Sequence, residues 1–158
     1  MFIPDNVEGI SFTNRPIAVP YNYRIIYRIS QIILIIYYCC NRKACSLEKI
    51  HITSTALSTK DEMEKLLQFL DKENESYILV RFNPAINRAI DFALAEDILI
   101  RQKNGLFKLS TKGKKYMDNI VKDKDLFIFE KLNLSNIGTK LTEDRINQLI
   151  SLWRGSYV

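Results

Sequence analysis

The chain contains little of what metal sites, disulfide frameworks and disordered linkers require. Its 158 residues include one histidine, three cysteines, five glycines and four prolines. So few glycines and prolines leave little room for disorder, because disordered and low-complexity segments are rich in both. Two of the cysteines are adjacent and none has an obvious partner, which fits a reducing cytosol better than an oxidising compartment.

A continuous apolar run long enough to cross a bilayer is also lacking. The most apolar segment, Ile25 to Cys40, is interrupted by Arg28, Ser30 and Gln31. A spanning helix needs about 20 apolar residues in succession. Residues 1–20 lack the basic start and apolar core of a secretory signal. We therefore expect a cytoplasmic protein that has no membrane partner.

The sequence shows no arrangement typical of catalysis or of metal binding. We find no phosphate-binding glycine-rich loop, nucleophile elbow or metalloprotease motif. Cys39, Cys40, Cys45 and His51 are enough ligands in number for zinc, but their spacing is not that of a structural site. Adjacent helical residues also point about 100° apart. We expect buried thiols and a packed histidine there, and hence no metal, no cofactor and no enzymatic activity.

The strongest pattern is the order helix, hairpin, helix in residues 82–118. Asn83 is a typical N-cap, and Pro84 suits the first helical position, where its missing N–H would have no partner in any case. Apolar residues then recur at the spacing of one buried helical face, at Ile86, Ala89, Ile90, Ala93 and Leu94. This pattern predicts a helix from Pro84 to Asp97.

Two short strands and a second helix follow. Ile98 to Gln102 and Leu106 to Leu109 flank the sequence Lys103-Asn104-Gly105. Asn-Gly supplies the positive φ angles of a tight hairpin. Ser110 or Thr111 caps a helix that continues to Val121.

The remaining elements complete an α+β prediction. Three prolines indicate an irregular arm over residues 1–20. We expect helices over Tyr21 to Cys40, over Asp125 to Leu132 and from Thr142 onward. Ser46 caps a further helix over Glu48 to Leu57, and Ser58 or Thr59 caps the helix that follows it. Tyr77 to Phe82 is β-branched and aromatic and predicts a strand that pairs with the hairpin. The expected fold is a helix-rich winged-helix domain, residues 21–122, with a three-stranded wing sheet and a C-terminal helical extension, residues 123–158.

The predicted helix before the hairpin is acidic, whereas the hairpin and the helix after it are basic. The helix Pro84 to Asp97 carries Arg88 against Asp91, Glu96 and Asp97, which is the wrong sign for a helix that reads the major groove. Residues 98–125 hold eight Lys and Arg against three Asp and Glu. Candidate contacts to a nucleic-acid backbone are Arg101, Lys103, Lys108, Lys112, Lys114 and Lys115. The alternative is a solvated hairpin, since basic wings also occur on protein-binding winged helices.

The first helix offers a candidate partner interface. It is more apolar than the outer helix of a small domain should be, and aromatic residues of its kind are enriched at interfaces. The candidates are Tyr21, Tyr23, Tyr27, Tyr37 and Tyr38. The same composition also fits the central helix of a core, so both interpretations stay open.

Four segments carry a resemblance to a known group of proteins. YRISQIILIIYYC, SLEKIHITSTALST, VRFNPAINRAIDFALAEDILI and KLSTKGKKYMDNI resemble the middle components of bacterial ABC-three-component systems, to which the Lamassu-type antiphage systems belong. The likeness covers most of residues 21–153. It implies a non-enzymatic winged-helix subunit that bridges an SMC-like or Rad50-like ATPase and an effector, with non-specific contact to double-stranded DNA. The alternative function is a dimeric winged-helix transcriptional regulator.

Overall fold

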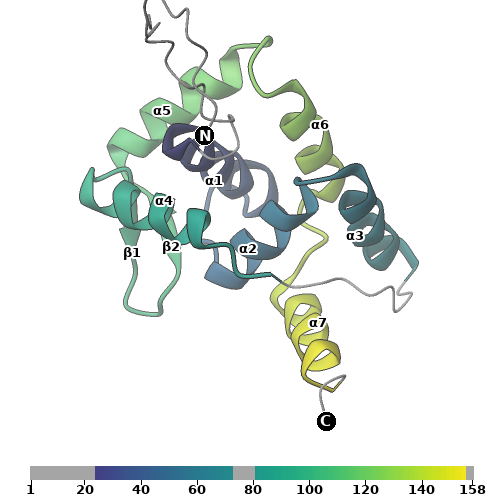
Figure 1. Ribbon diagram of the computed structural model, residues 1–158. Helices are drawn as coiled ribbons and strands as arrows, with labels where there is room; N and C mark the ends of the chain where they lie inside the picture. Colours follow the sequence, from purple (N-terminus) through teal and green to yellow (C-terminus); the bar gives the residue numbers. More distant parts are fainter. Residues whose placement is uncertain (1–23, 73–80, 156–158) are drawn as a thin grey trace, which may run out of the picture.

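The computed structural model describes residues 24–72 and 81–155, and it is mostly helical with one small antiparallel hairpin (Figure 1). The irregular arm predicted for residues 1–20 lies outside the described residues. Within the described ranges the elements are α1 (Ile25–Cys39), α2 (Leu47–Ala56), α3 (Lys60–Lys72), α4 (Pro84–Ala95), β1 (Leu99–Arg101), β2 (Phe107–Leu109), α5 (Thr111–Lys122), α6 (Ile128–Ile137) and α7 (Glu143–Gly155).

Helix α1 occupies the centre of the molecule. It contacts α2, α4, α5, α6 and β2, and Figure 1 shows it enclosed by these elements. The five residues Ile32 to Ile36 are each 0% exposed. Burying one such side chain contributes roughly 1.5–3 kcal/mol. The structure therefore supports the interpretation of this helix as the central helix of the core, and not as a partner interface.

The polar side chains that interrupt the apolar run of α1 are buried, and they form hydrogen bonds with one another and with α2. The Arg28 guanidinium donates to Gln31 Oε1 at 3.0 Å and to Ser54 Oγ of α2 at 3.3 Å. Ser54 Oγ also donates to Gln31 Oε1 at 3.1 Å. These bonds offset the cost of removing the three groups from water. Arg28 and Gln31, which interrupt the apolar run in the sequence, thus join α1 to α2 through Ser54.

The caps expected from the sequence are largely confirmed. Ser46 Oγ accepts from Lys49 N at 3.3 Å, and Asn83 Oδ1 accepts from Ala85 N at 2.9 Å. Of the paired alternatives, Thr59 Oγ1 accepts from Glu62 N at 3.2 Å and Ser110 Oγ accepts from Gly113 N at 3.0 Å. A side-chain cap acts over two or three residues, which is why it can be recognised without a structure.

The hairpin forms where predicted, with a different turn. Leu99 pairs with Leu109 and Arg101 with Phe107, and Gln102 N donates to Leu106 O at 2.8 Å. In the three-residue loop only Gly105 has a positive φ, of 84°. Asn104 was expected to share that conformation and does not. Three-residue hairpin loops need just one left-handed residue, which glycine adopts without strain.

The predicted third strand is not present in the described part of the chain. Residues 77–80 lie outside it, and Arg81 and Phe82 are not in a strand. The place beside β2 is taken by Cys45, whose N and O bond Phe107 O and N at 2.8 and 2.9 Å. A local β-rich composition cannot reveal which segment occupies a sheet edge, because pairing is long-range.

The C-terminal helices pack on the rest of the molecule. Helix α6 lies against α1 and α3, and α7 lies against α2. Helix α6 begins at Ile128, three residues later than predicted, after Phe127 in a left-handed conformation with φ of 55°. No helix in the described ranges has the length and apolar character needed to span a bilayer.

We expect Ile35→Ala to lower the free energy of unfolding by about 2–5 kcal/mol, because the cavity would lie in a fully buried part of α1. Ile26→Ala is the matched control in the same helix, where the side chain is 69% exposed, and it should change stability by less than about 0.5 kcal/mol. Denaturant titration of both variants measures the difference. Equal effects would contradict the central position of α1.

Candidate functional site

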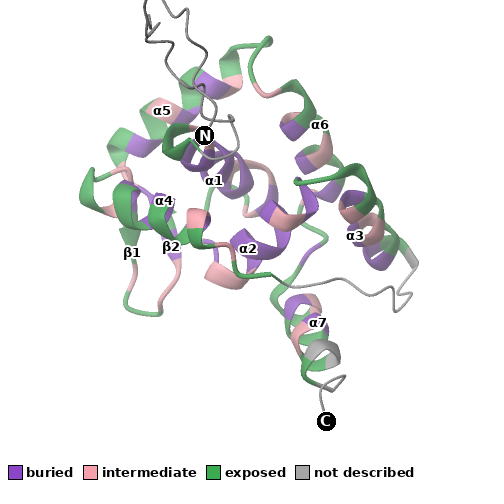
Figure 2. Cartoon of the chain, viewed as in Figure 1, coloured by how far each residue is buried: buried purple, intermediate pink, exposed green. Residues whose placement is uncertain are grey.

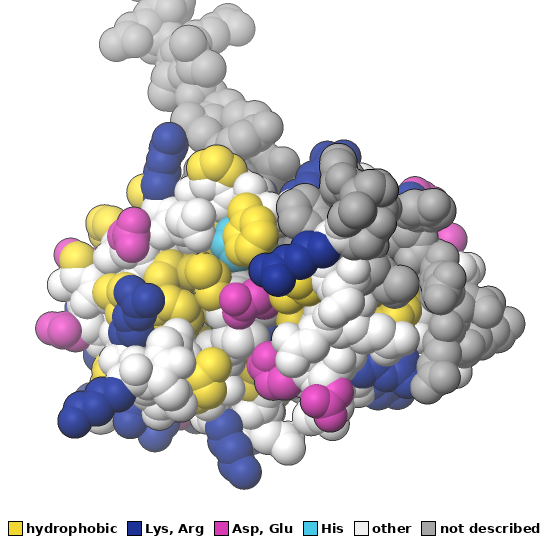
Figure 3. Space-filling model, turned by 90° about the horizontal axis from the view of Figure 1, so that it is seen from below, with side chains coloured by type: hydrophobic (Ala, Val, Ile, Leu, Met, Phe, Trp, Pro, Cys, Tyr) yellow, Lys and Arg dark blue, Asp and Glu magenta, His cyan; other side chains and the backbone are white. Residues whose placement is uncertain are grey.

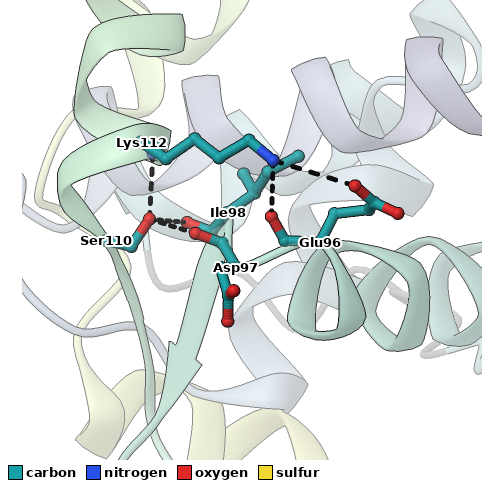
Figure 4. A network of polar contacts seen from close by, with 6 residues as sticks. Glu96, Asp97, Ile98, Ser110 and Lys112 are labelled. Atoms are coloured by element: carbon teal, nitrogen blue, oxygen red, sulfur yellow. Dashed lines mark hydrogen bonds and ion pairs between the residues drawn. The ribbon is translucent and has the colours of Figure 1, made fainter.

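The C-terminal end of α4 is tied to the start of α5 by polar contacts (Figure 4). Lys112 Nζ donates to Glu96 O at 2.8 Å and lies 3.7 Å from Glu96 Oε2. The Ser110 hydroxyl bonds the carbonyl oxygens of Asp97 and, at 3.1 Å, of Ile98. A cation at a helix C-terminus stabilises the exposed carbonyls there. Lys112 therefore has a structural role in joining two helices.

Gly113 permits the close approach of α5 to the backbone of Ile98, the residue before β1. A Cβ atom at this position would lie 2.3 Å from Ile98 O and 3.2 Å from Leu109 Cδ2. Since Ile98 O belongs to the backbone, it cannot move aside as a flexible side chain could. The glycine in the sequence Thr-Lys-Gly-Lys-Lys is thus explained by packing, because a side chain does not fit there.

We expect Gly113→Ala to destabilise the protein by about 1–3 kcal/mol through overpacking, although alanine is favoured over glycine in helices by about 1 kcal/mol. Asn119→Ala, at an exposed position of the same helix, is the control and should be neutral or mildly stabilising. Thermal unfolding followed by circular dichroism compares them. A stabilised Gly113→Ala protein would show that Gly113 and the Ile98 carbonyl lie farther apart than in the structure.

His51 anchors the other end of α4. Its side chain is fully buried. Asn83 N donates to His51 Nδ1 at 3.2 Å, so Nδ1 carries no proton. The proton is then on Nε2, which lies 2.9 Å from Asn87 Oδ1 and donates to it. The neutral imidazole thus holds the N-cap and the first turn of α4 together.

The pKa of His51 lies below its usual value, because burial disfavours the imidazolium. The hydrogen bond to Asn87 and the charge of Glu48 act in the opposite direction and only partly offset burial. Phe82 covers the ring, with 4.9 Å between the ring centres. A proton on Nδ1 would leave the Asn83 N–H without its acceptor.

We expect stability to fall as the pH is lowered from 7.5 to 5.5. The unfolded chain takes up a proton near pH 6.5, whereas the folded chain does so only at lower pH, so the neutral histidine stabilises the fold above 6.5 and this contribution is lost below it. His51→Gln should unfold more easily at pH 7.5 and show a flatter pH dependence. Chemical denaturation of both proteins at both pH values tests this. Parallel pH dependences would exclude His51 as the cause.

The six basic residues proposed for nucleic-acid contact face several directions. Lys108 shares the outward face of the hairpin with Ile100, whereas Arg101 lies on the opposite face, 5.8 Å from the centre of the Phe107 ring. Lys103 is exposed at the turn. On α5, Lys112 and Lys114 lie on opposite flanks, because two residues advance a helix by about 200°. Lys115 is exposed on the outer side.

The face of the molecule seen from below agrees with this distribution. Figure 3 shows basic side chains scattered singly among apolar and acidic ones, without a continuous positive surface. On α4, Asp91 and Phe92 are exposed, the carbonyl oxygen of the exposed Asn87 is engaged by His51, and Arg88 is the one exposed cation of the helix. A base-reading helix would instead present several free donors.

The tyrosines proposed as an interface are used within the chain where the structure describes them. Tyr27 donates to Glu130 Oε1 at 2.8 Å, and its ring centre lies 5.9 Å from that of Phe127. Tyr37 and Tyr38 are half-buried and stack edge to face at 4.8 Å. The remaining two, Tyr21 and Tyr23, lie outside the described residues. Partner contact by this set stays a prediction.

An apolar surface that the sequence did not single out lies at the start of α6. Leu126, Ile128, Phe129 and Leu132 are exposed by 45%, 63%, 42% and 61%, and Figure 2 shows exposed residues along this helix. We call these four residues the α6 apolar patch. The periodicity of residues 125–132 indicated a helix but not which side faces the core, since both sides of α6 carry large apolar residues.

A hollow of about 390 Å³ lies between α2 and the starts of α3 and α4. Its lining includes Arg28, Arg81, Ser54 and Glu62. Within the described ranges, no group of three His, Cys, Asp or Glu side chains is placed to hold a metal ion.

Comparison of the chain with protein-family models, with curated proteins and with solved structures finds no match. The function therefore has to be inferred from the residues and their arrangement.

Proposed function

We propose that this protein is a non-enzymatic winged-helix subunit that bridges an SMC-like or Rad50-like ATPase and an effector in a bacterial antiphage complex. The resemblance of four segments to ABC-three-component middle components supports the identity of the partners. The surfaces of the described residues support a protein that acts by binding other proteins.

The order of the elements supports the winged-helix assignment. Helix α4 leads through a short turn into the β1–β2 hairpin, and α5 follows directly. Cys45, between α1 and α2, adds a single bridge to the outer edge of β2. The sheet in the described residues is thus smaller than the three-stranded wing expected from the sequence. The order helix, hairpin, helix agrees with that expectation.

The surface of α4 favours a protein partner over DNA bases. Asp91 and Glu96 are exposed there and would repel phosphates, and Phe92 is 44% exposed beside them. Lys112 is bound to the α4 C-terminus, which leaves Arg101, Lys103, Lys108, Lys114 and Lys115 as the exposed candidates for a duplex. Any contact with DNA is then non-specific and limited to the backbone.

The α6 apolar patch is the observation that carries the proposal. Four large apolar side chains are exposed within seven residues, and exposed apolar clusters mark protein interaction sites in soluble proteins. Phe129 and its aliphatic neighbours are of the type that anchors an interface.

Co-purification tests this function. The chain, expressed with the SMC-like or Rad50-like ATPase of the proposed complex, should be retained by a tag on the ATPase. Ile128→Asp should weaken this association by roughly tenfold or more, since a central interface residue contributes about 2 kcal/mol. Ile100→Asp is the matched control, because Ile100 is similarly exposed, at 43%, on the hairpin.

The regulator alternative predicts a different outcome. A symmetric dimer that shifts one DNA sequence in preference to others would overturn the proposal. If the duplex contact is non-specific, Lys114→Gln with Lys115→Gln should reduce retention of any duplex and its dependence on salt. Lys112 is unsuitable as a probe, because its loss would also disturb the end of α4.

A further inference from the structure

The hollow between α2 and the starts of α3 and α4 is large enough for a small organic molecule. Its volume of about 390 Å³ lies within the range of about 300–1,000 Å³ that small-molecule sites have. Its lining combines cations, hydroxyls, a carboxylate and an aromatic ring, among them Arg28, Thr59, Glu62, Arg81 and Phe82. Groups of this variety favour a ligand that has both a charged part and an aromatic part.

Two arginines from different parts of the chain line this hollow, and α2 contacts both of them. Arg28 of α1 is 8% exposed, and its guanidinium donates to Ser54 Oγ at 3.3 Å. The next residue of α2, Thr55, donates from Oγ1 to the backbone oxygen of Arg81 at 3.5 Å. Arg81 is exposed, and no carboxylate in the described part of the chain forms an ion pair with it. A guanidinium suits the oxygens of a phosphate, which it binds through two parallel hydrogen bonds.

Thr59 and Glu62, at the start of α3, add a donor and an acceptor to the same hollow. Thr59 Oγ1 accepts from Glu62 N at 3.2 Å, and the hydroxyl has its own proton to donate in addition. The Glu62 carboxylate lies 3.7 Å from Lys65 Nζ, which offsets part of its charge. A bare anion would still be repelled by Glu62, whereas a ligand with hydroxyl or amino groups beside its phosphate would donate to it.

Phe82 contributes an aromatic surface to the lining. It is 56% exposed, and its ring packs against His51 with 4.9 Å between the ring centres. This contact holds the ring in place. Nucleobases stack on exposed aromatic side chains, and the stacking tolerates any base because every base has a π-face. The hollow thus offers a stacking surface as well as cations.

We propose that this hollow binds a nucleoside monophosphate. The phosphate lies at Arg81 and Thr59, within the positive field of Arg28, and the base stacks on Phe82. Glu62 accepts a hydrogen bond from a ribose hydroxyl or from an amino group of the base. Binding is reversible and involves no covalent step. The inference does not depend on the proposed function, because the α6 apolar patch contributes no residue to the hollow.

Isothermal titration calorimetry of the full chain with three probes tests the proposal. The probes are adenosine monophosphate, adenosine and inorganic phosphate. We expect the monophosphate to bind roughly tenfold or more tightly than either of the others, because only this probe engages the cations and the ring together. A monophosphate that does not bind at millimolar concentration would overturn the proposal. Equal affinity for inorganic phosphate would also contradict it, since the ring would then contribute nothing.

Three single substitutions locate the site. Arg81→Gln should weaken binding of adenosine monophosphate by roughly tenfold or more, through loss of charged hydrogen bonds to the phosphate. Phe82→Leu keeps apolar cover over His51 and should weaken the monophosphate by roughly fivefold or more, while leaving inorganic phosphate unchanged. Arg88→Gln is the matched control and should have no effect, because Arg88 is an exposed arginine of α4 that does not line the hollow.

Circular dichroism establishes that each variant is folded before titration. Equal weakening by Arg81→Gln and Arg88→Gln would show that net charge alone attracts the nucleotide, and would overturn the site. Unchanged binding in both Arg81→Gln and Phe82→Leu would place the nucleotide elsewhere on the molecule, with the same consequence. Co-purification with the ATPase tests the proposed function separately, so the failure of one proposal is distinguishable from the failure of the other.

Discussion

Burial of the isoleucine-rich helix α1 is the constraint on which the rest of the structure depends. β-Branched residues are not the strongest helix formers, so this helix is stabilised chiefly by its neighbours. Ile32 to Ile36 are fully buried, which requires apolar cover on almost every side. Helices α2, α4, α5 and α6 together with β2 supply that cover. The amphipathic character of the surrounding helices follows from this arrangement, since each has one face against α1 and another in water.

The same packing determines how α4 is presented. One end is held by His51, which accepts from Asn83 N and donates to Asn87, and the other end is held by Lys112 on Glu96. A helix fixed at both ends offers a rigid surface, and rigid surfaces bind with less loss of conformational entropy. The exposed side chains of α4 are of mixed charge with an aromatic ring among them, which suits a protein surface. The α6 apolar patch lies on a separate helix, so a bridging subunit would have two surfaces for two partners.

Local interactions were predictable, and long-range ones were not. The caps Ser46, Asn83 and Ser110 and the hairpin around Gly105 depend on residues within a few positions of one another. The neighbour of β2 was missed because Cys45 is separated from Phe107 by 62 residues of chain numbering, and composition does not encode pairing at that distance. The contact of Lys112 with Glu96, sixteen positions earlier, is likewise not visible in the sequence, which shows only the charge of the lysine.

The sequence by itself determined the helical segments, the hairpin and the absence of recognisable catalytic motifs, since these follow from periodicity, capping and residue type. Only the tertiary structure decided that α1 is the core and that His51 is a neutral anchor of α4. It also decided which side of α6 is left uncovered. The physical reason is common to all three cases. Burial and hydrogen bonding depend on which elements meet, and elements distant in sequence meet through the packing of the whole chain around one apolar helix.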